Sequence, residues 1–268
     1  MRRRSMLGAL VGTAMLGWNG TARAQGVTAD IKASLAPTGT LRAAINYGNA
    51  VLASRNAAGE LSGVSVDIAR ELARRLALPL TLVPFSEAGE VSAAASGNVW
   101  DVAFLARDPR RAQSISFTPA YVIIDGNYVV LRNSPILALE QIDRDGITIA
   151  VAAGSAYDLF LTRTLKHAHL VRAASGSEAL ALIRSNRADV LAGVKEALQQ
   201  IVTSDPSLRM IAEPFMTIDQ AMGTPAARPA AAAYLSAFVE DIKSSGFVAQ
   251  VLKQNGQDET LVAPPAKS

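Results

Sequence analysis

The stretch VSVDIARELARRLALPLTLVPF, residues 64–85, predicts a helix followed directly by a strand. Its apolar residues recur with a helical period and leave the charged residues on the opposite face. Pro79 ends this helix, and LTLVPF at 80–85 is predicted to be a strand. The apolar face of the helix comprises positions 64, 68, 69, 72, 73 and 76.

Similar elements lie on both sides of this stretch. LRAAINYG at 41–48 and WDVAFLA at 100–106 are typical of strands, and EVSAAASG at 90–97 is predicted to be a short helix. Strands that alternate with helices form a parallel sheet, because each helix returns the chain to the start of the next strand. The sequence therefore predicts an α/β fold.

A second series of alternating elements begins at residue 147. We expect its strands at 147–152, 168–173, 188–194 and 208–215, and its helices at 155–165, 177–185 and 195–204. Two β-like segments should connect the halves, at 115–132, with a turn at Asp125-Gly126, and at 217–225. One or two helices are expected at 230–256, followed by a loose tail. Two such halves suggest a ligand cleft between them.

The positive charge of the chain is concentrated at its N-terminus. The 268 residues carry a net charge of +3, and residues 1–24 hold four arginines and no acid. Without this segment 22 basic and 23 acidic groups remain, so the composition gives no reason to expect nucleic acid as a partner. The absence of cysteine excludes disulfides, thiol catalysis and cysteine metal sites.

Residues 1–24 have the pattern of a signal peptide. A basic start precedes an apolar run from Met6 to Trp18, and Ala22-Arg23-Ala24 is a small-x-small cleavage site. Arg3-Arg4 resembles a twin-arginine signal, so either the Sec or the twin-arginine route is open. We expect cleavage after Ala24 and a soluble periplasmic protein, and the alternative is an uncleaved membrane anchor.

Arginines follow the expected strand at 100–106. Asp108 is a favoured N-cap and Pro109 a favoured first helical residue, so a helix is predicted to begin here. Arg111 would then add a bidentate contact to an anion held at the helix start, at the carboxyl end of a strand where α/β proteins bind ligands. The alternative is a surface helix with solvated arginines.

AAGSAYD at 152–158 is the corresponding stretch of the second half. Ser155 and Asp158 have the spacing of a capping box, and Gly154 permits close backbone approach. This pattern predicts a second helix start that tolerates an anion. Ordinary helix capping is the alternative.

Taken together, these stretches resemble the bacterial extracellular solute-binding proteins of family 3, which serve ABC importers of polar amino acids. The resemblance covers residues 40–255 and rests on GELSGVSVDIARELARRL, RDPRRAQSISFTPAY, ITIAVAAGSAYDLFL and RADVLAGV. It implies a periplasmic binding protein type II fold, in which two Rossmann-like α/β lobes are joined by two crossing strands. The implied division is 40–127 for the first part of lobe 1, 128–216 for lobe 2, and 217–268 for the return crossing and the C-terminal helices, mostly in lobe 1.

The resemblance also implies ligand-binding residues. Arg111 matches the arginine that holds the ligand's α-carboxylate, and Gly154 and Ser155 match the turn that contacts the same group. Tyr47 and Asn49 match the segment that lines the cleft. Further contacts are expected from Phe104, Ala106, Asp108, Tyr157 and Lys195.

Three departures from the family pattern affect the expected ligand. The segment 104–108 is about two residues shorter, and 51–53 has no aromatic residue to stack on a ligand. Val194 stands where the family has the aspartate that binds an ammonium group, and the neighbouring Lys195 would favour a second anionic group. The ligand is therefore either an organic acid without an amino group or an amino acid whose ammonium meets Asp219 or Glu196.

The resemblance predicts the binding component of an ABC importer, which delivers a small carboxylate to a membrane permease. We expect a monomer without enzyme activity, cofactor or metal, since His167 and His169 lack the spacing of a zinc motif. One alternative is an enzyme similar to cyclohexadienyl dehydratase. Another is a ligand sensor that acts on a separate receptor. Carboxylates available to such an enzyme are Asp108, Asp158, Glu196 and Asp219.

Overall fold

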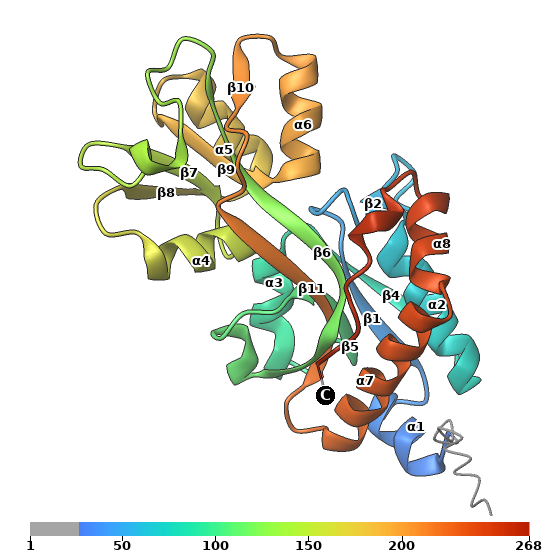
Figure 1. Cartoon of the computed structure of the whole chain (residues 1–268). Coiled ribbons are helices and arrows are strands. Elements are labelled where there is room, and N and C mark those ends of the chain that lie inside the picture. The colour runs from blue at the N-terminus through green and yellow to red at the C-terminus, as the bar shows by residue number, and fades with distance from the viewer. Residues whose placement is uncertain (1–26, 268) are drawn as a thin grey trace, which may run out of the picture.

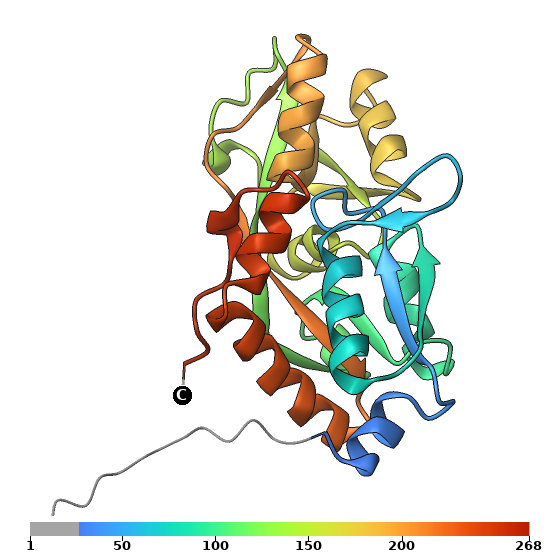
Figure 2. The ribbon, with the colours of Figure 1, turned by 90° about the vertical axis from the view of Figure 1, so that its right-hand side faces the viewer.

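The computed structural model describes residues 27–267, so the expected signal peptide at 1–24 lies outside the described residues. Two α/β lobes share one twisted sheet of nine strands (Figures 1 and 2). The strand order is β4-β1-β5-β11-β6-β9-β7-β8, and β10 pairs with β6. The two lobes are therefore continuous through the central strands β11 and β6.

Lobe 1 is built around the parallel strands β4, β1 and β5. Its N-terminal elements are α1 (Ala29–Leu35), β1 (Leu41–Asn46), β2 (Ser54–Arg55), β3 (Leu61–Ser62), α2 (Val64–Leu76), β4 (Leu80–Phe85), α3 (Ala88–Ala93) and β5 (Val102–Ala106). The helices α7 (Pro229–Ser244) and α8 (Phe247–Gln254) return to this lobe. The predicted apolar face of α2 is confirmed, since all six of its residues are buried.

Lobe 2 repeats this arrangement with parallel strands β8, β7 and β9. Its elements are β7 (Thr148–Ala152), α4 (Ala156–Thr164), β8 (His169–Ala173), α5 (Gly176–Arg184), β9 (Val190–Val194), α6 (Lys195–Ser204) and β10 (Leu208–Met210). The strand expected at 208–215 is therefore shorter than predicted. The α/β fold class itself is confirmed.

The crossings are β6 (Ile115–Leu131) and β11 (Met216–Pro225), which pair antiparallel. The turn expected at Asp125-Gly126 is wrong, because β6 continues through both residues. Gly126 pairs with Met216 on one side and with Val194 on the other. Ladder bonds on both sides of the strand outweigh the local preference of Asp-Gly for a turn.

The prediction of a loose C-terminal tail is also wrong. A 3₁₀ turn forms at Glu259–Leu261, and Val262 forms a bridge with Val122 of β6. The amide of Ala263 donates a hydrogen bond of 3.1 Å to the carbonyl of Tyr121. The tail lies along β6, and Ala263 is buried.

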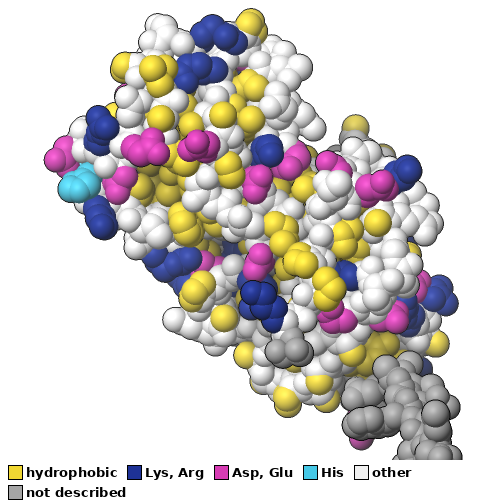
Figure 3. Space-filling model, viewed as in Figure 1, with side chains coloured by type: hydrophobic (Ala, Val, Ile, Leu, Met, Phe, Trp, Pro, Cys, Tyr) yellow, Lys and Arg dark blue, Asp and Glu magenta, His cyan; other side chains and the backbone are white. Residues whose placement is uncertain are grey.

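No helix within residues 27–267 is long and apolar enough to cross a membrane. Basic and acidic side chains are interspersed over the face shown in Figure 3, without a broad region of one sign.

Gly48 lies just after β1, where the chain passes close to the loop after β4. A Cβ atom at Gly48 would overlap the main-chain carbonyl oxygen of Ser86, whereas one at Gly176 would have no atom within 4 Å. We expect Gly48→Ala to lower the free energy of unfolding by about 2 kcal/mol or more, because a backbone must shift. Gly176→Ala, the matched control, should change it by less than about 1 kcal/mol. Urea denaturation measures both, and equal midpoints for the two variants would contradict this packing.

Candidate ligand-binding cleft

The two lobes touch through two glycines. Gly89 lies in the first turn of α3 in lobe 1, and Gly154 lies in the turn between β7 and α4 in lobe 2. A Cβ atom on Gly154 would lie 2.9 Å from the Cα atom of Gly89, and Gly154 has φ +70°. The lobes are therefore closed against each other, backbone to backbone, at a point where a larger side chain would hold them apart.

This contact borders two cavities. The inner cavity, of about 220 Å³, is lined by the chain neighbours of the two glycines, Ala88 and Ser155, and by the carboxyl ends of β1 and β9. Its polar lining consists of Asn46, Asn49, Glu87, Ser155, Tyr157 and Gln220. Its apolar lining includes Ala50, Ala156, Leu191, Val194, Leu198 and Ile218.

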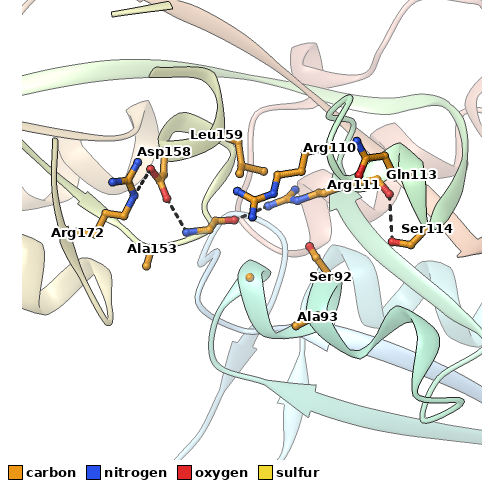
Figure 4. A pocket seen from close by; sticks show the side chains of 12 residues that line it. Ser92, Ala93, Arg110, Arg111, Gln113, Ser114, Ala153, Asp158, Leu159 and Arg172 are labelled. Atoms are coloured by element: carbon orange, nitrogen blue, oxygen red, sulfur yellow. Dashed lines mark hydrogen bonds and ion pairs between the residues drawn. The ribbon is translucent and has the colours of Figure 1, made fainter. Parts of the chain in front are cut away.

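The outer cavity, of about 530 Å³, is lined by Gly89 and Gly154 themselves. Its other walls are the C-terminal part of α3, the segment 110–114, the first turns of α4 and one residue of β8 (Figure 4). Three of its lining residues are arginines, namely Arg110, Arg111 and Arg172. The two cavities thus differ in charge, although both lie between the lobes.

The N-terminus of α4 faces the inner cavity. Ser155 caps the helix as predicted, since its Oγ accepts a hydrogen bond of 3.1 Å from the amide of Asp158. The Asp158 carboxylate accepts in turn from the amide of Gly154 at 2.8 Å. Among the described residues the amides of Ala156 and Tyr157 have no acceptor, and both residues line the inner cavity. Free amides at a helix start favour a negatively charged group.

Glu87 is the only charged residue among the described residues that line the inner cavity. It immediately precedes α3, opposite the helix start of α4 in the other lobe. Burial raises the pKa of its carboxyl, and the nearby acids Glu90 and Glu178 add to this effect. A cationic group in the cavity would oppose both effects and lower this pKa, because it stabilises the charged carboxylate.

Arg111 lies in the wall of the outer cavity, 3% exposed. Its Nη1 donates to the carbonyl of Ala106 at 2.9 Å and its Nη2 donates to the carbonyl of Gly154, in the other lobe, at 2.8 Å. Its Nε atom is buried without a partner. Burial lowers the pKa of Arg111 to about 10, although the nearby Asp108 acts in the opposite direction.

The helix predicted to begin at Asp108 is wrong. The chain forms a single 3₁₀ turn at Arg111–Gln113 and enters β6 at Ile115, because Ile115 is buried in the core. Asp108 does act as a local cap, since its Oδ1 accepts from the amide of Arg110 at 2.8 Å. One turn is too short to provide the helix start that we expected for an anion.

The structure places the other predicted site residues in several environments. Asn49, Ser155 and Tyr157 line the inner cavity together. Asp108 forms an ion pair across the lobes with Arg163 of α4, at 2.7 Å.

The remaining predicted residues do not line the inner cavity. Phe104 packs edge-on against Tyr121 in the core, and Ala106 contributes a carbonyl to Arg111. Tyr47 lies under the guanidinium group of Arg55, and Lys195 pairs with Asp125 at 3.3 Å. Asp219 lies 3.9 Å from Arg107, and neither it nor Glu196 lines the inner cavity.

Four residues that line the two cavities were not predicted from the sequence, namely Glu87, Asn46, Gln220 and Gly89. Asn46 and Glu87 lie at or just beyond the carboxyl ends of predicted strands, a position that could have singled them out. No local signal marks Gly89, because its role depends on the approach of Gly154. Within residues 27–267 no three His, Asp or Glu side chains gather as metal ligands would.

Two α/β lobes that share two crossing strands and enclose a polar cavity define a bilobal binding protein of the periplasmic type II fold. The chain belongs to the bacterial extracellular solute-binding proteins, family 3, which it matches over residues 41–257. No curated protein matches the sequence significantly.

Solved structures share this fold at low sequence identity. The solute receptor for L-cysteine of Neisseria gonorrhoeae has a TM-score of 0.73 and 19% identity, covering 83% of this chain and 92% of that one. The substrate-binding protein of an amino acid ABC transporter has a TM-score of 0.69 and 15% identity, covering 81% and 98%. The ancestral amino acid-binding protein AncCDT-1, a precursor of cyclohexadienyl dehydratase, has a TM-score of 0.70 and 16% identity, covering 82% and 96%.

The ion pair between Asp108 and Arg163 should help to hold the lobes closed without a ligand. We expect Arg163→Gln to raise the ratio of open to closed molecules about 1.4- to fivefold, because partly exposed pairs contribute about 0.2–1 kcal/mol. Single-molecule FRET, with one introduced cysteine in each lobe, measures this ratio.

The matched control for this experiment is Arg184→Gln. Arg184 also lies in the last turn of a lobe 2 helix, but its partner Asp205, at 2.8 Å, is in the same lobe. Its replacement should leave the ratio unchanged. Equal ratios in both variants would show that the interlobe pair does not stabilise closure.

Proposed function

We propose that this protein is the periplasmic solute-binding component of an ABC importer and that its ligand is a small amino acid or a related carboxylate. The observation that carries the proposal is that hydrogen-bond donors and a carboxylate lie in the same inner cavity, each suited to one end of an amino acid. The free amides of α4 belong to lobe 2, and the Glu87 carboxylate belongs to lobe 1. A zwitterion that satisfies both would link the lobes and favour the closed form.

The remaining walls of the cavity restrict the ligand's side chain. The cavity volume of about 220 Å³ lies below the range typical for drug-sized ligands. Leu191, Val194 and Ile218 offer apolar surface, and no basic residue within the described part of the chain lines the cavity. We therefore propose a small ligand with an uncharged side chain, whose ammonium meets Glu87 rather than Asp219 or Glu196.

The role of Arg111 in this proposal is electrostatic. In the closed structure its Nη atoms bind carbonyl oxygens, one of them that of Gly154 immediately before the α4 helix cap. Its positive charge lies close to the helix start that would receive the carboxylate. Direct contact between Arg111 and the ligand, as the family resemblance implies, would require the bond to Gly154 to open.

Membership of the family supports a role in solute transport and a location in the periplasm. Its members are extracellular solute-binding proteins, and one structural neighbour is the binding protein of an amino acid ABC transporter. The proposal includes export by the signal at 1–24, a monomeric protein and delivery to a membrane permease. Native mass spectrometry of freshly purified protein would identify a co-purified ligand.

We expect Glu87→Gln to weaken the binding of an amino acid by about tenfold to a hundredfold, because a charge-assisted hydrogen bond is lost. A thermal-shift screen of amino acids provides the ligand, and calorimetry compares the variants. Glu213→Gln is the matched control, since Glu213 is exposed and outside the inner cavity.

The α-hydroxy acid analogue of the same ligand provides a second comparison. It lacks the ammonium group, so it should bind more weakly than the amino acid and should be insensitive to Glu87→Gln. Affinity for the amino acid should fall as pH decreases through the raised pKa of Glu87, because the protonated carboxyl no longer attracts a cation. Equal affinities for the amino and hydroxy acids would contradict the assignment of Glu87.

A second candidate function is an enzyme similar to cyclohexadienyl dehydratase. The observation that favours it is again Glu87, since a carboxyl with a raised pKa in a cavity is suited to general acid catalysis. Asp108 and Asp158 are both engaged in ion pairs and do not line the inner cavity. We expect no aromatic product on incubation with prephenate or arogenate, and product formation that Glu87→Gln abolishes would favour the enzyme.

A further inference from the structure

The outer cavity has an unbalanced positive charge. Its lining includes Arg110, Arg111 and Arg172, and its only acid among the described residues is Asp158. Asp158 is already engaged by Arg172, whose Nε lies 2.9 Å from Oδ1, and by the amide of Gly154. Arg110 and Arg111 form no ion pair with any described residue.

Arg111 is the more unusual of these two arginines. It is 3% exposed, so its charge is largely removed from water, yet its two hydrogen-bond partners are neutral carbonyl groups. Its Nε atom has no partner at all. A buried charge is costly unless an opposite charge is near, and Asp108, the nearby acid, already pairs with Arg163.

An anion in the outer cavity would supply the missing negative charge. The exposed Arg110 borders the same cavity and can donate forked hydrogen bonds to an oxyanion. The side-chain amide of Gln113 adds a further donor to the lining, whereas the hydroxyls of Ser92 and Ser114 already donate to the carbonyls of Ala88 and Arg111. Figure 4 shows the side chains of Arg110 and Arg111 extending toward the side of the cavity where Leu159 and Asp158 of lobe 2 lie.

We propose that the outer cavity is a second binding site, separate from the inner cavity, for a small oxyanion such as a carboxylate or phosphate. The site is complete only when the lobes are closed, because α3 and the segment 110–114 belong to lobe 1 whereas α4 and β8 belong to lobe 2. The anion therefore stabilises the closed form. This proposal does not depend on the ligand of the inner cavity.

Calorimetry of the full chain with inorganic phosphate and with succinate, at constant ionic strength, tests the site. We expect saturable binding of at least one anion, weakened about tenfold or more by Arg110→Gln, which removes a charge-assisted contact. Ala93→Glu should abolish binding. Ala93 is exposed and lines the cavity, so the introduced carboxylate would lie in the cavity and repel an anion. If only phosphate binds, the site is specific for a phosphate group. If only succinate binds, it is specific for a carboxylate.

Two variants serve as controls for position and fold. Arg187→Gln removes an exposed arginine of lobe 2 that lies outside the outer cavity, and it should leave the affinity unchanged. Glu87→Gln, in the inner cavity, should also leave anion binding unchanged. The proposal is overturned if neither anion gives saturable binding, or if binding persists unaltered in both Arg110→Gln and Ala93→Glu, as it would for an anion bound in the inner cavity.

Discussion

The pairing of β6 with β11 is the constraint on which the rest of the structure depends. β6 extends over 17 residues and belongs to both lobes within their shared sheet, and β11 lies antiparallel beside it. Each lobe is therefore an extension of the same two strands. Because these strands fix the position of one lobe relative to the other, the carboxyl ends of β1, β5, β7 and β9 face one another across a cleft. Strand ends of this kind are where α/β proteins bind ligands.

Within this frame, the closed approach of the lobes divides the cleft. The contact of Gly89 with Gly154 separates a cavity that has amides and one carboxylate from a cavity bordered by guanidinium groups. Arg111 lies at the boundary and donates hydrogen bonds to one main-chain carbonyl in each lobe. One arginine can thus influence closure, the inner cavity and the outer cavity together.

The fold was largely predictable from the sequence, whereas the site was predictable only in part. The period of α2 and the cap at Ser155 are local signals, and the structure confirms both. The continuity of β6 at Gly126 was missed because it arises from partners distant in the chain. Glu87 was missed for a similar reason, since its place in the inner cavity depends on lobe 2 residues that are distant in the chain.

The ordered tail after residue 256 has a consequence for the solution behaviour of the protein. In lobe 1, β6 is the last strand of the sheet, and such a strand offers unpaired amides and carbonyls to other molecules. The bridge of Val262 with Val122 and the bond from Ala263 to Tyr121 occupy part of that edge. The tail therefore covers part of the edge at which a strand of another molecule could pair.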